Sequence, residues 1–103
     1  MIITTTESIT GKNLEMLGLV KGNVVRAKHI GRDIAAGFQS IVGGELQGYT
    51  ELMSEARSIA TERMVTEAMN MRADAVICAR YVTASVSQGA CEVMAYGTAV
   101  RFV

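Results

Sequence analysis

The sequence TELMSEARSIATERMVTEAMNM, residues 50–71, carries the longest regular pattern in the chain. Its apolar side chains recur every three or four residues, which places them along one side of an α-helix. Neither Gly nor Pro interrupts the run. We therefore predict a long helix over about 50–71, with Thr50 as its N-cap. The apolar stripe consists of Leu52, Met53, Ala56, Ile59, Ala60, Met64, Ala68 and Met71.

The segments on both sides of this helix are rich in β-branched residues, which favour strands. Two interior glycines, Gly18 and Gly22, would each weaken a helix by about 1 kcal/mol, whereas in a strand they mark a bend or a close approach of another backbone. The predicted strands are residues 2–6, 14–29, 73–83 and 91–103, with a hairpin loop over 84–90.

The last strand, CEVMAYGTAVRFV, is asymmetric. Its odd positions are mostly small and its even positions are bulkier. Small residues allow a helix to lie close, so we expect the long helix over the odd face. The even face then has no second long helix to cover it, which predicts self-association. The odd positions are Cys91, Val93, Ala95, Gly97 and Ala99, and the bulky even ones are Met94, Tyr96, Val100 and Phe102.

The order strand, helix, strand, strand predicts a two-layer α+β sandwich with a mainly antiparallel sheet. At 103 residues the chain is expected to form a single domain, 1–103. Ile30, Ile34, Phe38 and Ile41 recur at helical spacing, which predicts a short helix over about 31–42.

Composition narrows the classes of partner. Ten basic and ten acidic residues cancel, and no run of basic residues could follow a phosphate backbone, so we expect no nucleic acid partner. No apolar run has the roughly 18 residues of a membrane span. The N-terminal sequence lacks a secretory signal, and two cysteines fit a reducing compartment. We therefore expect a cytoplasmic protein.

Three glycines, Gly43, Gly44 and Gly48, fall within the stretch IVGGELQGYTELMSEAR, residues 41–57. The spacing is not that of a P-loop, which needs four residues between its glycines and a Lys-Ser/Thr pair. The start of the following helix could still hold an anion. We interpret the glycines mainly as a tight corner that reverses the short helix into the long one.

The polar residues near these glycines form a possible ligand site. Arg57 could pair with Asp33 or with Glu45, either within a chain or across a subunit boundary, because its planar guanidinium suits a carboxylate. Tyr49 would lie nearby. The sequence allows two interpretations of these residues. One is a ligand site composed of Asp33, Glu45, Tyr49 and Arg57, and the other is a salt bridge at a subunit interface.

The two cysteines, Cys78 and Cys91, flank the predicted hairpin loop. A loop centred between residues 84 and 85 would place them opposite each other, close enough for a disulfide or a soft-metal pair. One bulge residue would break this register. Two thiols are too few for a structural zinc site, and buried cysteines are often only small apolar residues.

The chain resembles the YbjQ-like family, whose small bacterial and archaeal members have no determined activity and carry a heavy-metal-binding label. The segments that carry the resemblance are TTTESITGK, LGLVKGNVV, RDI, IVGGELQGYTELMSEAR and ADAVI. The family motif falls on Asp33, Gly43, Gly44, Glu45, Tyr49, Ala56 and Arg57. The chain departs from the family at Thr10-Gly11, at Arg72-Ala73 and near Cys78, all outside the GGE block.

The resemblance implies a subunit similar to that of dodecin and assembly into a homopentamer. We therefore expect a ring-forming binding or scaffold protein, with a metal ion or small anion held between subunits near Glu45, Tyr49 and Arg57. One alternative is an enzyme that uses Glu45 as acid/base and Arg57 to hold an anion. Another is a purely structural assembly module. The sequence identifies no cofactor.

Overall fold

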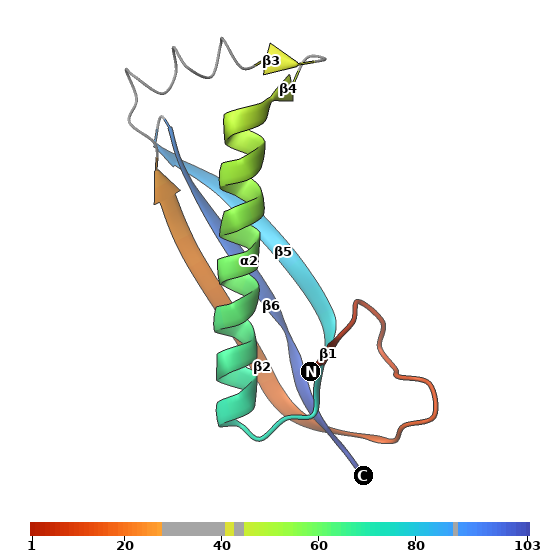
Figure 1. The fold of residues 1–103 in the computed structure, drawn as a ribbon. Helices are drawn as coiled ribbons and strands as arrows, with labels where there is room; N and C mark the ends of the chain where they lie inside the picture. The colour runs from red at the N-terminus through yellow and green to blue at the C-terminus, as the bar shows by residue number, and fades with distance from the viewer. Residues whose placement is uncertain (28–40, 43–44, 88) are drawn as a thin grey trace.

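One long helix lies across a sheet of three long strands and one short strand (Figure 1). The computed structural model describes residues 1–27, 41–42, 45–87 and 89–103. The long elements follow the predicted order of strand, helix, strand, strand. The elements are β1 (Ile2–Ile3), β2 (Leu14–Ala27), β3 (Ile41–Val42), β4 (Glu45–Leu46), α2 (Gln47–Asn70), β5 (Ala75–Ser87) and β6 (Ala90–Phe102).

The main sheet has the strand order β1-β5-β6-β2. The long pairs β5–β6 and β6–β2 are antiparallel, whereas β1 pairs in parallel with the start of β5. The sheet is therefore mixed, which corrects the prediction of a mainly antiparallel sheet. The parallel pair arises because residues 4–13 carry the chain from the end of β1 around to β2 at the opposite edge (Figure 1).

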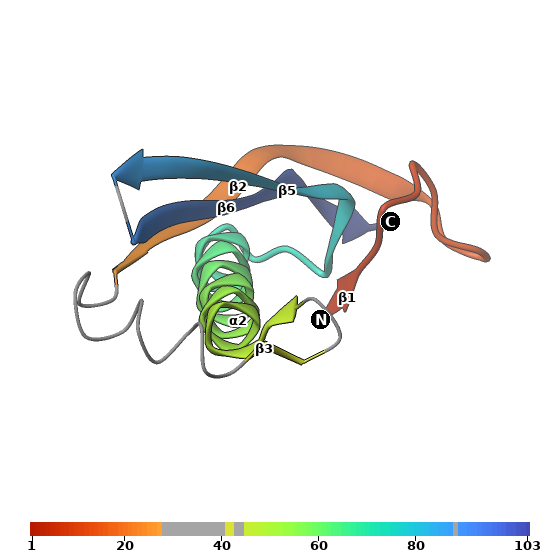
Figure 2. The same cartoon turned by 90° about the horizontal axis from the view of Figure 1, so that it is seen from above.

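Helix α2 packs on one face of this sheet (Figure 2). The predicted odd face of β6 is the face it covers, since Val93, Ala95 and Ala99 are all buried in the cluster under the helix. The helical stripe is also confirmed. The buried members of the cluster are Val20, Val24, Ala56, Ala60, Met64, Ala68, Val76, Ala79, Val93, Ala95 and Ala99.

Small residues let the helix approach the sheet closely. A Cβ atom placed on Gly22 would lie 2.3 Å from the backbone nitrogen of Met64 and 2.4 Å from the carbonyl oxygen of Ala60. The glycine therefore marks a close approach of a helix backbone to β2, as its position in a strand predicts. A hydrogen bond of 2.6 Å between the hydroxyls of Thr61 and Tyr81 also joins α2 to β5.

Among the described residues, the opposite face of the sheet is covered at one end. Ile9 and Leu14 pack there against the buried residues Ala75, Ile77 and Val100. Beyond that end, no described element covers this face of the sheet (Figure 2). Directly paired residues share a face, so the strand register defines this uncovered surface, which we call the open face. Its residues include Leu19, Lys21, Asn23, Val25, Arg80, Val82, Ala84, Glu92, Met94, Tyr96 and Thr98.

Around the glycine-rich stretch the structure departs from the sequence prediction. Ile41–Val42 and Glu45–Leu46 pair as two short antiparallel strands, so the predicted helix does not extend to residue 42 and the corner does not join two helices. Residues 31–40, Gly43 and Gly44 lie outside the described residues. Gly48 lies inside α2, which starts at Gln47, so Thr50 is not its N-cap.

Within the described part of the chain, no helix combines the length and the apolar character needed to cross a bilayer.

Candidate functional site

The β5–β6 hairpin is longer and tighter than the sequence suggests. Strand β5 continues to Ser87, and Ser87 pairs with Ala90. Gly89 supplies a positive φ of 73° at the tip, a conformation that glycine adopts without steric cost. The predicted loop over 84–90 is therefore wrong, because Ala84–Ser87 extends β5 and Ala90 already belongs to β6.

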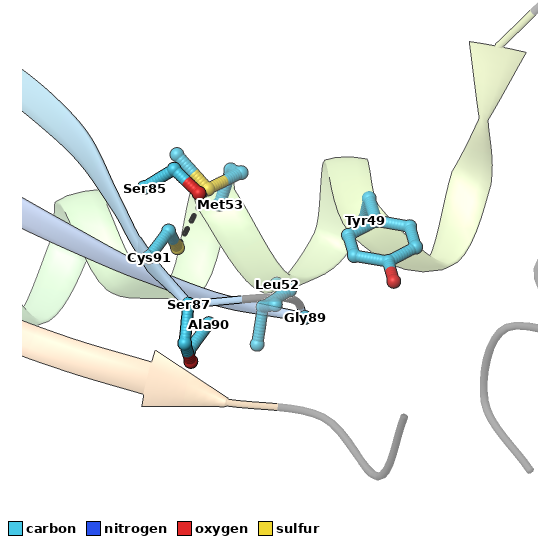
Figure 3. Close-up of a pocket in the computed structure, with 8 residues that line it drawn as sticks. All are labelled: Tyr49, Leu52, Met53, Ser85, Ser87, Gly89, Ala90 and Cys91. Atoms are coloured by element: carbon cyan, nitrogen blue, oxygen red, sulfur yellow. Dashed lines mark hydrogen bonds between the residues drawn. The ribbon is translucent and has the colours of Figure 1, made fainter. Parts of the chain in front are cut away.

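A pocket of about 220 Å³ lies between this hairpin tip and the first turns of α2 (Figure 3). The helix contributes one side of the lining and the two strands contribute the other. Most of the lining is apolar, and three of the lining residues, Tyr49, Ser85 and Ser87, carry hydroxyl groups. The lining residues are Tyr49, Leu52, Met53, Ser85, Ser87, Gly89, Ala90 and Cys91.

Two sulfur atoms meet in this tip pocket. The thiol of Cys91 contacts the thioether sulfur of Met53, with Sγ and Sδ 3.1 Å apart (Figure 3). Met53 lies one helical turn after Tyr49, so the two residues share a face of α2, and both line the pocket. The strand register places Cys91 opposite Ser85. The pocket thus combines two soft sulfur donors with hydroxyl groups in a mainly apolar lining.

The predicted facing pair of Cys78 and Cys91 is wrong. Cys91 pairs with Ser85, whereas Cys78 lies in a bulge between Ile77 and Arg80. Cys78 has a positive φ of 53°, and its N–H donates to the carbonyl of Thr6. The register differs because the turn centres near residue 89 rather than 84–85. Both cysteines are free thiols, and within the described residues neither belongs to a group of three or more His, Cys, Asp or Glu side chains that could hold a metal ion.

The other predicted site residues lie in different places. Tyr49 lines the tip pocket. Arg57 does not, and its guanidinium donates a hydrogen bond of 3.2 Å to the hydroxyl of Ser54. Glu45 is in the short strand β4, directly before α2. Asp33 lies outside the described residues. The described structure therefore brings Tyr49 and Cys91 to one pocket, and it does not bring Arg57 there.

A second hollow lies at the other end of the molecule, and its lining contains only hydroxyl and apolar side chains. It is lined by Ile2, Thr4, Thr6, Ser8, Ile9 and Thr10. The hydroxyls of Thr4 and Thr6 hydrogen-bond each other at 2.8 Å, and that of Thr6 also bonds to the carbonyl of Ser8. These groups satisfy one another, so we take the tip pocket as the candidate site.

The sequence prediction missed most of the pocket lining. Met53 was assigned to the core stripe of the helix, and Ser85, Ser87 and Ala90 were assigned to a loop. The signal that could have found them is Gly89, because a tight turn there places Ser85 opposite Cys91.

This chain is similar to known proteins along its whole length. A model of the YbjQ family, described as "Putative heavy-metal-binding", matches residues 1–103. A protein of Vibrio campbellii named UPF0145 is 55% identical over 104 residues and covers all of both chains. A UPF0145 protein of Thermotoga maritima is 57% identical over 102 residues, which is 98% of this chain and 96% of that one.

A solved structure has the same fold. It is a protein of unknown function from Pediococcus pentosaceus, described as belonging to the DUF74 family. The two align with a TM-score of 0.69 over 100% of this chain and 98% of the other, at 20% sequence identity. This likeness shows the fold of the chain and carries no statement about its activity.

Proposed function

The chain belongs to the YbjQ family, and from this premise we propose that it is a binding protein that works as an assembly of identical copies. Each copy would hold a small ligand in the tip pocket. The observation that carries the proposal is the pocket itself, because a mainly apolar hollow lined by a few residues with polar groups is a common form of a small-ligand site.

Self-association is supported by the shape of the single chain. Its radius of gyration is 16.9 Å, whereas a compact domain of this length has about 13 Å. Its accessible surface is 6520 Å², compared with about 5600 Å² for a typical monomer of 11.0 kDa. An extended chain with excess surface is typical of a subunit that is completed by neighbours.

The open face gives this assembly a surface to use. Leu19 is 64% exposed, Val25 is 55% exposed and Val82 is 45% exposed, although all three are apolar. Lys21 and Arg80 lie on the same face as Glu92, so a second copy would meet both signs of charge. The chain has no net charge to oppose the contact. We therefore propose that copies of this chain cover the open face.

We also propose a number of subunits and a cellular compartment for the protein. The family resemblance supports a homopentamer, because members of the family are expected to form rings of five. The two free thiols support a reducing compartment, so we place the protein in the cytoplasm.

Filling the tip pocket should prevent ligand binding. Ala90 lines the pocket, and replacing it with Leu would put a larger side chain into the space of about 220 Å³. In a thermal-shift screen of metal ions, anions and nucleotides, a bound ligand should raise the melting temperature of the wild type with increasing concentration. We expect Ala90→Leu to lose this shift.

The control for this screen is Val86→Leu, which enlarges an exposed side chain close to the tip that is not part of the lining. It should keep the shift seen in the wild type. If the ligand raised the melting temperature of Ala90→Leu as much as that of the wild type, it would bind outside the tip pocket. If no compound raised the melting temperature of the wild type, the binding proposal would be wrong.

A further inference from the structure

We propose that Met53 and Cys91 together bind a soft monovalent metal ion, of the chemical class of Cu(I), within the tip pocket. This inference rests on the proposed binding function and names the ligand of the same pocket. The family description mentions heavy metals but assigns no residues, whereas the contact between Sγ of Cys91 and Sδ of Met53 identifies two donors in this chain.

The donor types select the class of metal. Thiolate and thioether sulfur are soft ligands, which favour Cu(I) over Mg²⁺, Ca²⁺ or Mn²⁺. A structural zinc site needs four protein ligands, and a catalytic one normally has three. The eight lining residues include no His, Asp or Glu that would raise the count to three. Two sulfur donors alone suit an ion that accepts low coordination.

Charge balance selects a monovalent ion. When the ion binds, the S–H bond of Cys91 breaks, its proton passes to solvent and a metal–sulfur bond forms. The thiolate then carries one negative charge and the thioether carries none, so a monovalent ion leaves the pair neutral. A divalent ion would leave one uncompensated positive charge among mainly apolar groups, which is costly. Binding should therefore also tighten as the pH rises.

The geometry allows the ion to enter. Two metal–sulfur bonds of about 2.3 Å each, as in zinc thiolates, would hold the sulfur atoms up to about 4.6 Å apart in a linear arrangement. The observed separation is 3.1 Å, so the pair must open by more than an ångström. Met53 can supply this movement, because its unbranched side chain has three rotatable bonds and lies beside the free volume of the pocket.

The test measures Cu(I) affinity directly, by anaerobic competition with a coloured Cu(I) chelator, with stoichiometry from native mass spectrometry. Wild-type protein should bind one Cu(I) per chain. Cys91→Ser should lower the Cu(I) affinity by roughly 100-fold or more, and Met53→Leu should lower it by about tenfold. Removing even a group that only hydrogen-bonds to a metal ligand typically lowers metal affinity by 10–100-fold. Met53→Leu conserves side-chain volume, so it should fold normally.

The matched control is Cys78→Ser, which removes the other thiol of the chain while leaving the pocket intact. It should bind Cu(I) as the wild type does. Three results would overturn the inference: a loss of affinity in Cys78→Ser instead of Cys91→Ser, an unchanged affinity in Met53→Leu, or no Cu(I) binding by the wild type.

The same experiments separate this inference from the proposed function. If another compound raises the melting temperature of the wild type but not of Ala90→Leu, while Cu(I) does not bind, then the pocket is a ligand site and only the metal assignment fails. If neither Cu(I) nor any other compound binds, both proposals fail.

Discussion

Replacing Gly22 with Ala should lower the free energy of unfolding by about 3 kcal/mol or more, the upper range for overpacking a core. The added Cβ would lie 2.3 Å from the backbone nitrogen of Met64, 2.4 Å from the oxygen of Ala60 and 2.6 Å from Cβ of Arg63. Two of these are backbone atoms of α2, which cannot rotate away. The whole helix would have to move off β2. Urea denaturation followed by circular dichroism measures the change.

The control is Gly11→Ala, which makes the same chemical change where no atom lies within 4 Å of the new Cβ. Gly11 has a positive φ of 77°, so a cost of about 1 kcal/mol is expected from backbone strain alone. If Gly22→Ala were no more destabilising than Gly11→Ala, the close approach of α2 to β2 would be incorrect.

Replacing Leu19 with Asp should separate the proposed assembly into single chains. Leu19 is 64% exposed on the open face. Burying a leucine side chain contributes about 1.5–3 kcal/mol, and an unpaired carboxylate in its place would oppose association further. The dissociation constant should therefore rise by at least about 100-fold. Sedimentation velocity over a range of concentrations measures this.

The control for Leu19 is Met69→Asp. Met69 is 62% exposed and equally apolar, but it lies near the end of α2 rather than on the open face. It should leave the assembly unchanged. If both variants dissociated, the effect would reflect added charge in general, and if neither did, the open face would not be the contact surface.

The long helix could be predicted from the sequence because its signal is local. The apolar stripe repeats at helical spacing for more than five turns. Five of its residues are buried and the other three are partly buried; the buried ones are Leu52, Ala56, Ala60, Met64 and Ala68. Gly22 was also interpreted correctly, since a glycine inside a strand pattern indicates a close backbone approach. The start of the helix was placed three residues late, because Gly48 was assigned to a turn although it lies inside α2.

The hairpin register could not be predicted reliably because it depends on two small features. The turn at Gly89 and the bulge at Cys78 each shift the pairing, and a one-residue shift turns a side chain to the other face. The parallel pairing of β1 was also missed, because nothing local in Ile2–Ile3 indicates a partner more than 70 residues away.

The candidate site depends on that register, which is why its residues were mostly missed. Cys91 was identified as a possible metal ligand with the wrong partner, and the structure places Met53 next to it instead of Cys78. Of the predicted polar cluster, Tyr49 lines the pocket and Arg57 does not. The sequence therefore indicated Tyr49 and Cys91 separately, whereas their meeting in one pocket with Met53 required the three-dimensional pairing.

Native mass spectrometry of the gently purified wild-type protein most directly tests whether this polypeptide acts as a multi-subunit complex. At micromolar concentration we predict a complex of about 55 kDa, which is five copies of the 11.0 kDa chain. Additional mass retained per subunit would report the bound ligand. A spectrum containing only the 11.0 kDa species, still folded and without added mass, would contradict the account.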